Sequence, residues 1–245
     1  MKYFQIIFLL FFSCSLLAET RIDYYVNLGG IKIADANFTI KSDKNNWSLL
    51  TEVEAAGIVD VFVKFISTTE SKGIINDNKL VPELYKFSYL TGRGSSRNGS
   101  ITYKDNMPIR LAADPNYADD EKPSLKFLEK YGSDSNDPYS ALLVHGSYTD
   151  PCQFIAQGFD GLRSFKTIFV RPGKEEKIKI GEQEVLTSKC VGYFDPIIGY
   201  KESDFLDEIS KPGSVRYWFK YFETLNLWAP VKVIIDPPLG GFVLK

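Results

Sequence analysis

The chain has 245 residues, 44% of them hydrophobic and 24% charged, which suits one large β domain or two small ones. Its 29 lysines and arginines face 31 aspartates and glutamates, a formal net charge of −2, and no basic block is present. This balance argues against nucleic acid as a partner and against electrostatic adhesion to anionic lipid. Aromatic residues are abundant at 14%, as in β cores and in the walls of apolar ligand grooves.

The first twenty residues, MKYFQIIFLLFFSCSLLAET, have the pattern of a secretory signal peptide. Lys2 supplies the positive start, and an apolar run covers most of residues 4–12. Because a membrane-spanning helix needs roughly twenty apolar residues, this run is too short to be one. We expect cleavage after Ala18, so that a periplasmic mature chain without a transmembrane span starts at Glu19. The alternative is lipoprotein processing at Cys14, which anchors the chain to the membrane.

Removal of the signal peptide leaves two cysteines, Cys152 and Cys190. Disulfides persist in exported proteins, and a pair of cysteines allows a single connectivity. Such a bridge would add about 4 kcal/mol to the stability by the chain-entropy relation. Two buried free thiols or a reactive thiol are the alternatives. His145 is the only histidine and C-x-x-C is absent, so the sequence predicts no metal site, no thiol catalysis and no cofactor.

The N-terminal half is predicted to be a run of antiparallel strands joined by turns. Apolar and polar residues alternate along residues 21–28, 31–40, 49–55, 67–75 and 80–89. A change of phase near Ile33 and Ala34 predicts a β-bulge. Residues 55–65 have apolar side chains at helical spacing, and we expect a short helix after Gly57. The stretch TGRGSSRNGS at 91–100 predicts a hairpin tip or a loop.

The middle of the chain contains two segments with helical signals. Residues 114–136 form the longest irregular stretch, and 125–131 within it are compatible with a helix. The sequence DPYSALLVHG at 137–146 predicts a second helix. In this helix Asp137 is the N-cap, Pro138 is the first helical residue and Gly146 ends the helix.

The stretch PCQFIAQGFDG at 151–161 predicts a strand over 152–157 followed by a tight turn. We expect Phe159 to pack in the core, Asp160 to bond neighbouring amides, and Gly161 to adopt a positive φ. Further strands are predicted over 162–170, 177–180, 185–191, 215–221, 231–235 and 242–244. Neither a repeat nor a linker interrupts this pattern, so we predict a signal peptide over 1–18 and a single all-β domain over 19–245.

Several stretches together resemble a family of exported bacterial proteins, the domain of unknown function 3108. They are YYVNLGGIKIADANFTI, EAAGIVDVFVKFISTTESKG, LVPELYKF, DPYSALL, PCQFIAQGFDGLRSF and CVGY, in the family's order over residues 24–193. Ala34 stands where members often have glycine. Leu162 precedes the single Arg163 where members often have consecutive basic residues after FDG. If those basic residues bind something in relatives, Arg163 and Lys166 are the positions that inherit the role.

The resemblance implies a mainly β envelope protein with a single curved antiparallel β-sheet, half-barrel or open-barrel-like, and one or two short helices. It implies no established reaction. Our first functional hypothesis is a non-catalytic periplasmic protein that binds an apolar envelope component, such as a lipid or acyl chain, on the curved sheet. The alternative is an assembly module that binds another envelope protein by strand addition. We expect Arg93, Arg97 and Arg163 to contact a charged head group or a partner.

An enzyme is the third class of function. The carboxylates in predicted strands or turns are Glu52, Glu54, Glu70 and Asp160. Their spacing does not indicate a pair set for acid–base catalysis, so we expect a protein without enzymatic activity.

Overall fold

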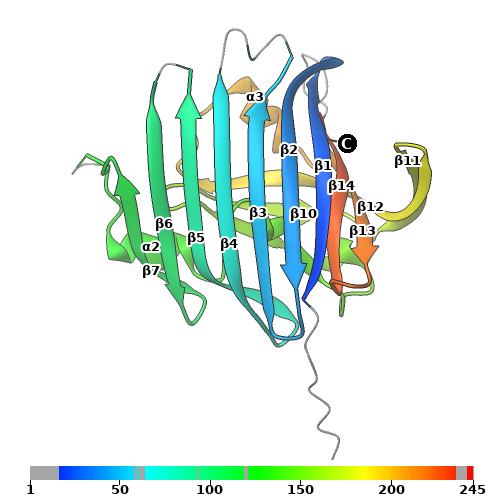
Figure 1. The fold of residues 1–245 in the computed structure, drawn as a ribbon, viewed down its shortest axis with the longest axis horizontal. Helices are drawn as coiled ribbons and strands as arrows, with labels where there is room; N and C mark the ends of the chain where they lie inside the picture. The colour runs from blue at the N-terminus through cyan, green and yellow to red at the C-terminus, as the bar shows by residue number, and fades with distance from the viewer. Residues whose placement is uncertain are drawn as a thin grey trace, which may run out of the picture.

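The computed structural model describes residues 17–57, 60, 64–92, 94–118, 121–235 and 242–244. Seven consecutive strands form an antiparallel meander at the front of the molecule (Figure 1). They are β1 (Ala18–Leu28), β2 (Ile31–Ser42), β3 (Asn46–Ala55), β4 (Phe65–Asn76), β5 (Lys79–Thr91), β6 (Ser96–Lys104) and β7 (Met107–Asp114). Each pairs with the next, as the alternation of apolar and polar residues predicts.

The rest of the chain forms the back of the molecule. It contains the helices α2 (Leu125–Gly132) and α3 (Asp204–Ile209) and the 3-10 turns η1 (Ser140–Leu142) and η2 (Pro151–Gln153). The strands are β8 (Val144–His145), β9 (Ala156–Phe159), β10 (Ser164–Phe169), β11 (Lys174–Ile180), β12 (Gln183–Ile198), β13 (Val215–Phe222), β14 (Leu227–Ile235) and β15 (Phe242–Leu244).

One continuous sheet links front and back. Its strand order is β7-β6-β5-β4-β3-β2-β1-β15-β14-β13-β12-β10-β9, with β11 on β12 and β8 on β14 as side branches. β15, near the C-terminus, lies between β1 and β14, so it joins the front meander to the back strands. The sheet curls, and the back strands cross behind the upright front strands (Figure 1). The fold is therefore the curved antiparallel half-barrel that the sequence predicts.

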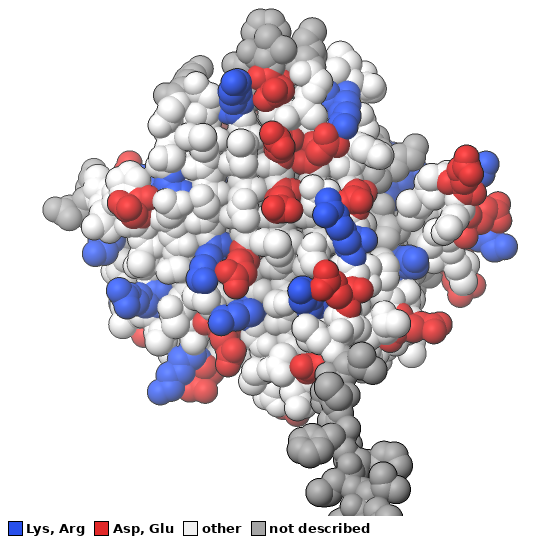
Figure 2. Space-filling model, in the orientation of Figure 1, with Lys and Arg blue, Asp and Glu red and all other residues white. Residues whose placement is uncertain are grey.

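The front sheet is amphipathic because side chains alternate between its two faces. Along β4 every second residue is buried on the inner face, and the residues between them, such as Glu70, are exposed. The outer face carries interspersed charges of both signs (Figure 2), with ion pairs such as Lys86–Glu70 at 3.2 Å and Lys41–Glu19 at 2.8 Å. Exposed pairs of this kind each contribute about 0–1 kcal/mol.

The chain's own side chains fill most of the inner face. One apolar cluster lies between β2, β3 and β14 and includes Ile40, Leu49 and Leu227. A second lies under α2, where Ile101 of β6 and Leu128 of α2 enclose Phe159. A third surrounds Cys152 and Cys190 and includes Val144, Ile209, Val215, Tyr217, Phe219 and Val233. The interior of the half-barrel is thus largely filled by the chain's own side chains.

Some local predictions are confirmed and others are wrong. The register shift opposite Ile33 is the expected bulge, and α2 lies where a helix was expected. The helix predicted over 137–146 is instead the short turn η1, because residues 144–145 pair with β14. The strand predicted over 152–157 is wrong for residues 152–155, because η2 covers residues 151–153 and β9 begins at Ala156. The helix after Gly57 falls largely on residues outside the described part of the chain.

The predicted processing sites fall at and before the first strand. Ala18 is the first residue of β1 and pairs with Ser42, and Glu19 pairs with Lys41. Cys14 and the apolar run before it lie outside the described residues. Within the residues that the structure describes, no helix has the length and apolar character needed to cross a membrane.

Candidate functional site

The FDG sequence forms a hairpin tip that lies inside the curl of the sheet. Asp160 Oδ1 accepts hydrogen bonds from the backbone N–H groups of Leu162 at 3.0 Å and Arg163 at 2.7 Å. Gly161 has a φ of +99°, and a Cβ atom there would lie 3.0 Å from Leu111 Cδ1 of β7. Phe159 is the last residue of β9 rather than part of the turn, and its side chain is fully buried. The tip therefore rests on β6 and β7.

A cleft of about 170 Å³ lies between this hairpin and the inner face of β4, β5 and β6. Arg97 on β6 and Arg163 after the hairpin tip both line it, so the structure brings together two of the three arginines chosen from the sequence. The third, Arg93, lies outside the described residues. Four tyrosines also line the cleft, namely Tyr85, Tyr89, Tyr117 and Tyr139. We call this site the tyrosine–arginine cleft.

The two arginines differ in how much of their charge is compensated. Arg163 Nε donates to Asp160 Oδ2 at 2.7 Å, so a carboxylate already faces its guanidinium. The Arg97 guanidinium lies 4.4 Å from the ring centroid of Tyr117, a cation–π contact that leaves its net charge in place. Its Nε is buried and has no hydrogen-bond partner among the described residues. Among the residues that line the cleft, two arginines therefore face one carboxylate, and Arg97 is the arginine that does not pair with it.

The floor of the cleft is formed by Ser67 and Thr69 of β4, and two further buried hydroxyl groups lie next to it on β3 and β4. Thr69 lines the cleft, is only 3% exposed, and its Oγ1 has no hydrogen-bond partner within the described chain. Thr51 pairs directly with Thr69 across the strands, and Ser71 pairs with Tyr85; the Thr51 and Ser71 hydroxyls also lack described partners. An unsatisfied buried hydroxyl costs roughly 1–3 kcal/mol. Polar ligand atoms or water at this floor would offset that cost.

Three tyrosine hydroxyls at and beside the cleft have a raised pKa, those of Tyr117, Tyr139 and Tyr200, and remain protonated at neutral pH. Burial raises the pKa of Tyr139, and the nearby Asp137 carboxylate raises it further. Burial also raises the pKa of Tyr117, which the Arg97 charge opposes. At Tyr200, whose ring lies 6.0 Å from the Arg163 guanidinium, burial raises the pKa to about 12. These groups can therefore donate hydrogen bonds to an anion.

Asp137 holds the segment that carries Tyr139 against the cleft. Its Oδ1 accepts the N–H groups of Tyr139 at 3.0 Å and Ser140 at 3.1 Å, and its Oδ2 accepts the Ser140 hydroxyl. The residue thus bonds the amides at the start of η1, where the sequence predicts an N-cap for a longer α-helix. These bonds fix the Tyr139 backbone beside the front sheet.

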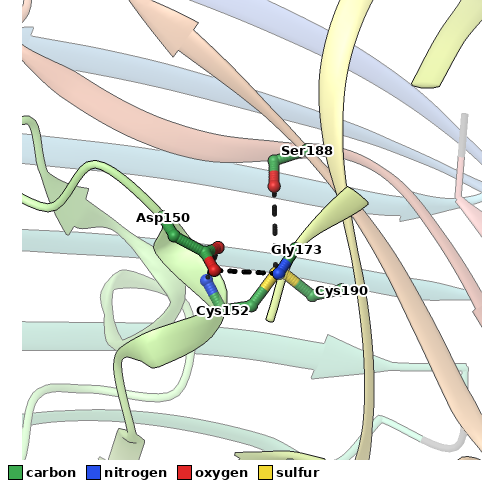
Figure 3. The surroundings of a disulfide bond; sticks show 5 residues. All are labelled: Asp150, Cys152, Gly173, Ser188 and Cys190. Atoms are coloured by element: carbon green, nitrogen blue, oxygen red, sulfur yellow. Dashed lines mark hydrogen bonds between the residues drawn. A yellow bond between two sulfur atoms is a disulfide. The ribbon is translucent and has the colours of Figure 1, made fainter. Parts of the chain in front are cut away.

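Cys152 and Cys190 form a disulfide with a Cα–Cα distance of 5.3 Å (Figure 3). Asp150 accepts the N–H of Cys152 at 2.9 Å and that of Gly173 at 2.8 Å, so its carboxylate ties η2 to the turn before β11. Cys152, Cys190 and Asp150 lie close enough to resemble a set of metal ligands. Because both sulfur atoms are in the disulfide, neither is a thiolate donor, and the cluster is structural.

The carboxylates considered for catalysis lie on two opposite faces of the front sheet. Glu52, Glu54 and Glu70 are exposed on the outer face of β3 and β4. Asp160 lies on the other side of that sheet, in the tyrosine–arginine cleft. The structure therefore does not bring these four groups together as a pair set for acid–base chemistry.

The sequence pointed to Arg97, Arg163 and Asp160 but not to the tyrosines or to Thr69. The missed signal is in β4, where serine and threonine occupy the buried positions 67, 69 and 71. A strand with hydroxyl groups on its core-facing side indicates a polar interior.

A comparison with protein families matches residues 21–245 to the family described as "Protein of unknown function (DUF3108)". Neither the search of curated proteins nor the search of solved structures gave a significant match. The family match covers nearly the whole chain and includes every residue of the tyrosine–arginine cleft. The protein therefore belongs to the DUF3108 family.

Proposed function

We propose that the protein is an exported, non-catalytic cell-envelope protein that binds an anionic group of an envelope component, such as the head group of a lipid, in the tyrosine–arginine cleft. The observation that carries this proposal is the combination of the uncompensated Arg97 charge with the unpartnered, buried Thr69 hydroxyl. An anion with several oxygen atoms supplies acceptors to both. Arg163 and the protonated tyrosine hydroxyls add further donors.

In this arrangement the polar end of the ligand lies inside the tyrosine–arginine cleft. An acyl chain lying along the inner face would need an open apolar groove, and the apolar clusters around Leu49 and Phe159 occupy that space. The cleft itself, at about 170 Å³, suits a head group rather than a whole lipid. Phe87, Tyr89 and Leu162 at its wall supply apolar surface for the first carbons of a tail.

One observation favours the alternative of an assembly module. β11 pairs with β12 alone, so its other edge is unpaired in the described chain, and the β11–β12 hairpin projects from the body of the molecule (Figure 1). Strand addition uses such an edge. The sequence of β11, KEEKIKI, is rich in charges of the kind that protect edges from pairing, which weighs against this alternative.

Titration with dihexanoyl phosphatidic acid by calorimetry tests the proposal. We expect binding by the wild type and a loss of affinity of about 10-fold or more in Arg97→Ala, because a hydrogen bond to a charged group contributes roughly 1.5–3 kcal/mol. Arg171→Ala, an exposed arginine in the turn before β11, is the matched control and should bind as the wild type. Equal affinities for wild type and Arg97→Ala, or no binding at all, would contradict the proposal.

Thr69→Val tests what the hydroxyl group at the floor of the cleft contributes to binding, separately from the charge of Arg97. Valine keeps the shape of threonine and removes the unpartnered hydroxyl. We expect the ligand-free variant to be as stable as the wild type or more stable, since no described hydrogen bond is lost. Its affinity for dihexanoyl phosphatidic acid should fall. A variant that loses stability without losing affinity would show that the hydroxyl has a structural partner and that the ligand does not reach the floor.

A further inference from the structure

A second concavity, of about 470 Å³, lies at the opposite end of the interior from the tyrosine–arginine cleft. Its rim is formed by the β4–β5 and β6–β7 turns, and its wall by the segments before and after η2. Its volume is within the range of about 300–1,000 Å³ that small-molecule sites occupy. We call this concavity the amide groove.

Side-chain amides dominate the polar lining of this groove. They belong to Asn78, Asn106, Asn136, Gln153 and Gln157. The formal charges at the groove are those of Lys79 and Asp134, and Asp134 accepts a hydrogen bond from Asn106 at 2.8 Å. An amide offers a donor and an acceptor side by side, which matches two neighbouring hydroxyl groups. The lining therefore suits a neutral, hydroxyl-rich ligand better than an anion.

The backbone requirements of tight turns explain only two of these five side-chain amides. Asn78 and Asn106 have positive φ values of 61°, and asparagine is a common residue in such tight hairpin turns. Gln153 in η2, Asn136 beside β9 and Gln157 in β9 have no such backbone requirement. Gln157 Nε2 donates to Ser135 Oγ at 2.9 Å, which fixes that amide in place. The side chain of Gln153 is exposed at the groove and makes no hydrogen bond with the described chain.

One wall of the amide groove is apolar and rigid. The rings of Tyr148 and Phe154 pack edge to face, with centroids 5.6 Å apart. Trp228 Nε1 donates to the backbone carbonyl of Tyr148 at 2.9 Å, which holds this wall against β14. Ile155, next to Phe154, is 56% exposed. Exposed apolar surface of this kind can pack against the C–H face of a pyranose ring.

We propose that the amide groove is a second ligand site, which binds a neutral saccharide unit. The ligand's hydroxyl groups bond the amides of Gln153 and Asn136, and its apolar face packs on Phe154 and Ile155. This site shares no lining residue with the tyrosine–arginine cleft, so its occupancy is independent of the function proposed above.

Two-dimensional NMR of the full chain, titrated with tri-N-acetylchitotriose and with maltotriose, tests this site. We expect at least one of the two to shift the signals of residues 153–157, and Gln153→Ala to weaken that binding about 10-fold, equivalent to roughly 1.4 kcal/mol. Gln183→Ala, an exposed glutamine at the start of β12, is the matched control. Arg97→Ala should bind the sugar normally, which separates this proposal from the previous one.

Three outcomes would overturn the saccharide proposal. The first is no shift with either sugar at millimolar concentration. The second is an equal loss of binding in Gln153→Ala and Gln183→Ala, which would place the interaction elsewhere. The third is binding that is lost in Arg97→Ala, which would assign the sugar to the tyrosine–arginine cleft.

Discussion

Replacement of both Cys152 and Cys190 by alanine is expected to lower the free energy of unfolding by about 4 kcal/mol. The bond closes a loop of 38 positions that contains the FDG hairpin and β11, and it fastens η2 to the long strand β12. Without it the unfolded chain gains freedom, while the native contacts of Asp150 with Cys152 and Gly173 remain. The loss therefore acts mainly through the unfolded state.

Urea and thermal unfolding of the purified protein measure this loss. A decrease of that size corresponds to a fall in Tm of roughly 10 °C for a chain of this length. Reducing agent should shift the wild type to the stability of the double variant and leave the double variant unchanged. A double variant within about 1 kcal/mol of the wild type would show that the disulfide does not stabilise the fold.

Phe159→Ala is expected to lower the free energy of unfolding by about 3–5 kcal/mol. The ring is fully buried, and its centroid lies 6.4 Å from that of Phe127 in α2. It packs with Ile101 and Leu128, so it joins the FDG hairpin, α2 and the front sheet in one cluster. The neighbouring residue of α2 is Gly132, where a Cβ atom would lie 2.7 Å from the Phe159 ring. Because this position has no side chain, it cannot fill the space that the ring leaves. A cavity should therefore remain.

Urea unfolding compares this variant with Leu186→Ala, whose side chain on β12 is 56% exposed. The surface variant should change the stability by less than about 0.5 kcal/mol. Because Phe159 anchors the hairpin that carries Asp160 and Arg163, the Phe159→Ala protein should also bind dihexanoyl phosphatidic acid more weakly under native conditions. Similar stabilities for the two variants would mean that the hairpin is not anchored through this ring.

Much of the sheet could be predicted from local sequence because its strands are amphipathic and its turns carry Asn, Asp or Gly. The positive φ values at Asp77, Asn78, Asp105 and Asn106 fall in two-residue turns of this kind. The segment at 137–146 was mispredicted, since pairing of Val144 and His145 with β14 outweighs the local helical signal. Such long-range pairing leaves no trace in a short window of sequence.

The site was less predictable than the fold, because its parts come from distant segments. Arg97 in β6, Thr69 in β4 and Arg163 after β9 meet only when the sheet curls. The sequence identified Arg97 because it stands in a stretch predicted to be a hairpin tip or a loop, although it lies in β6, and Arg163 because it follows the predicted FDG turn. The buried hydroxyl groups of β4 could be recognised only once the inner face of that strand was known. Family membership and the curved sheet are confirmed. Export and ligand binding remain predictions.

Native mass spectrometry of the protein purified without added lipid tests the central claim most directly. We expect the wild type to carry a bound species that is anionic after extraction, and the Arg97→Ala/Arg163→Ala variant to carry none while unfolding at a similar temperature. Adducts of equal abundance on both proteins would contradict binding through the two arginines. A bare wild-type mass would also contradict the account, and would favour a protein partner at the edge of β11.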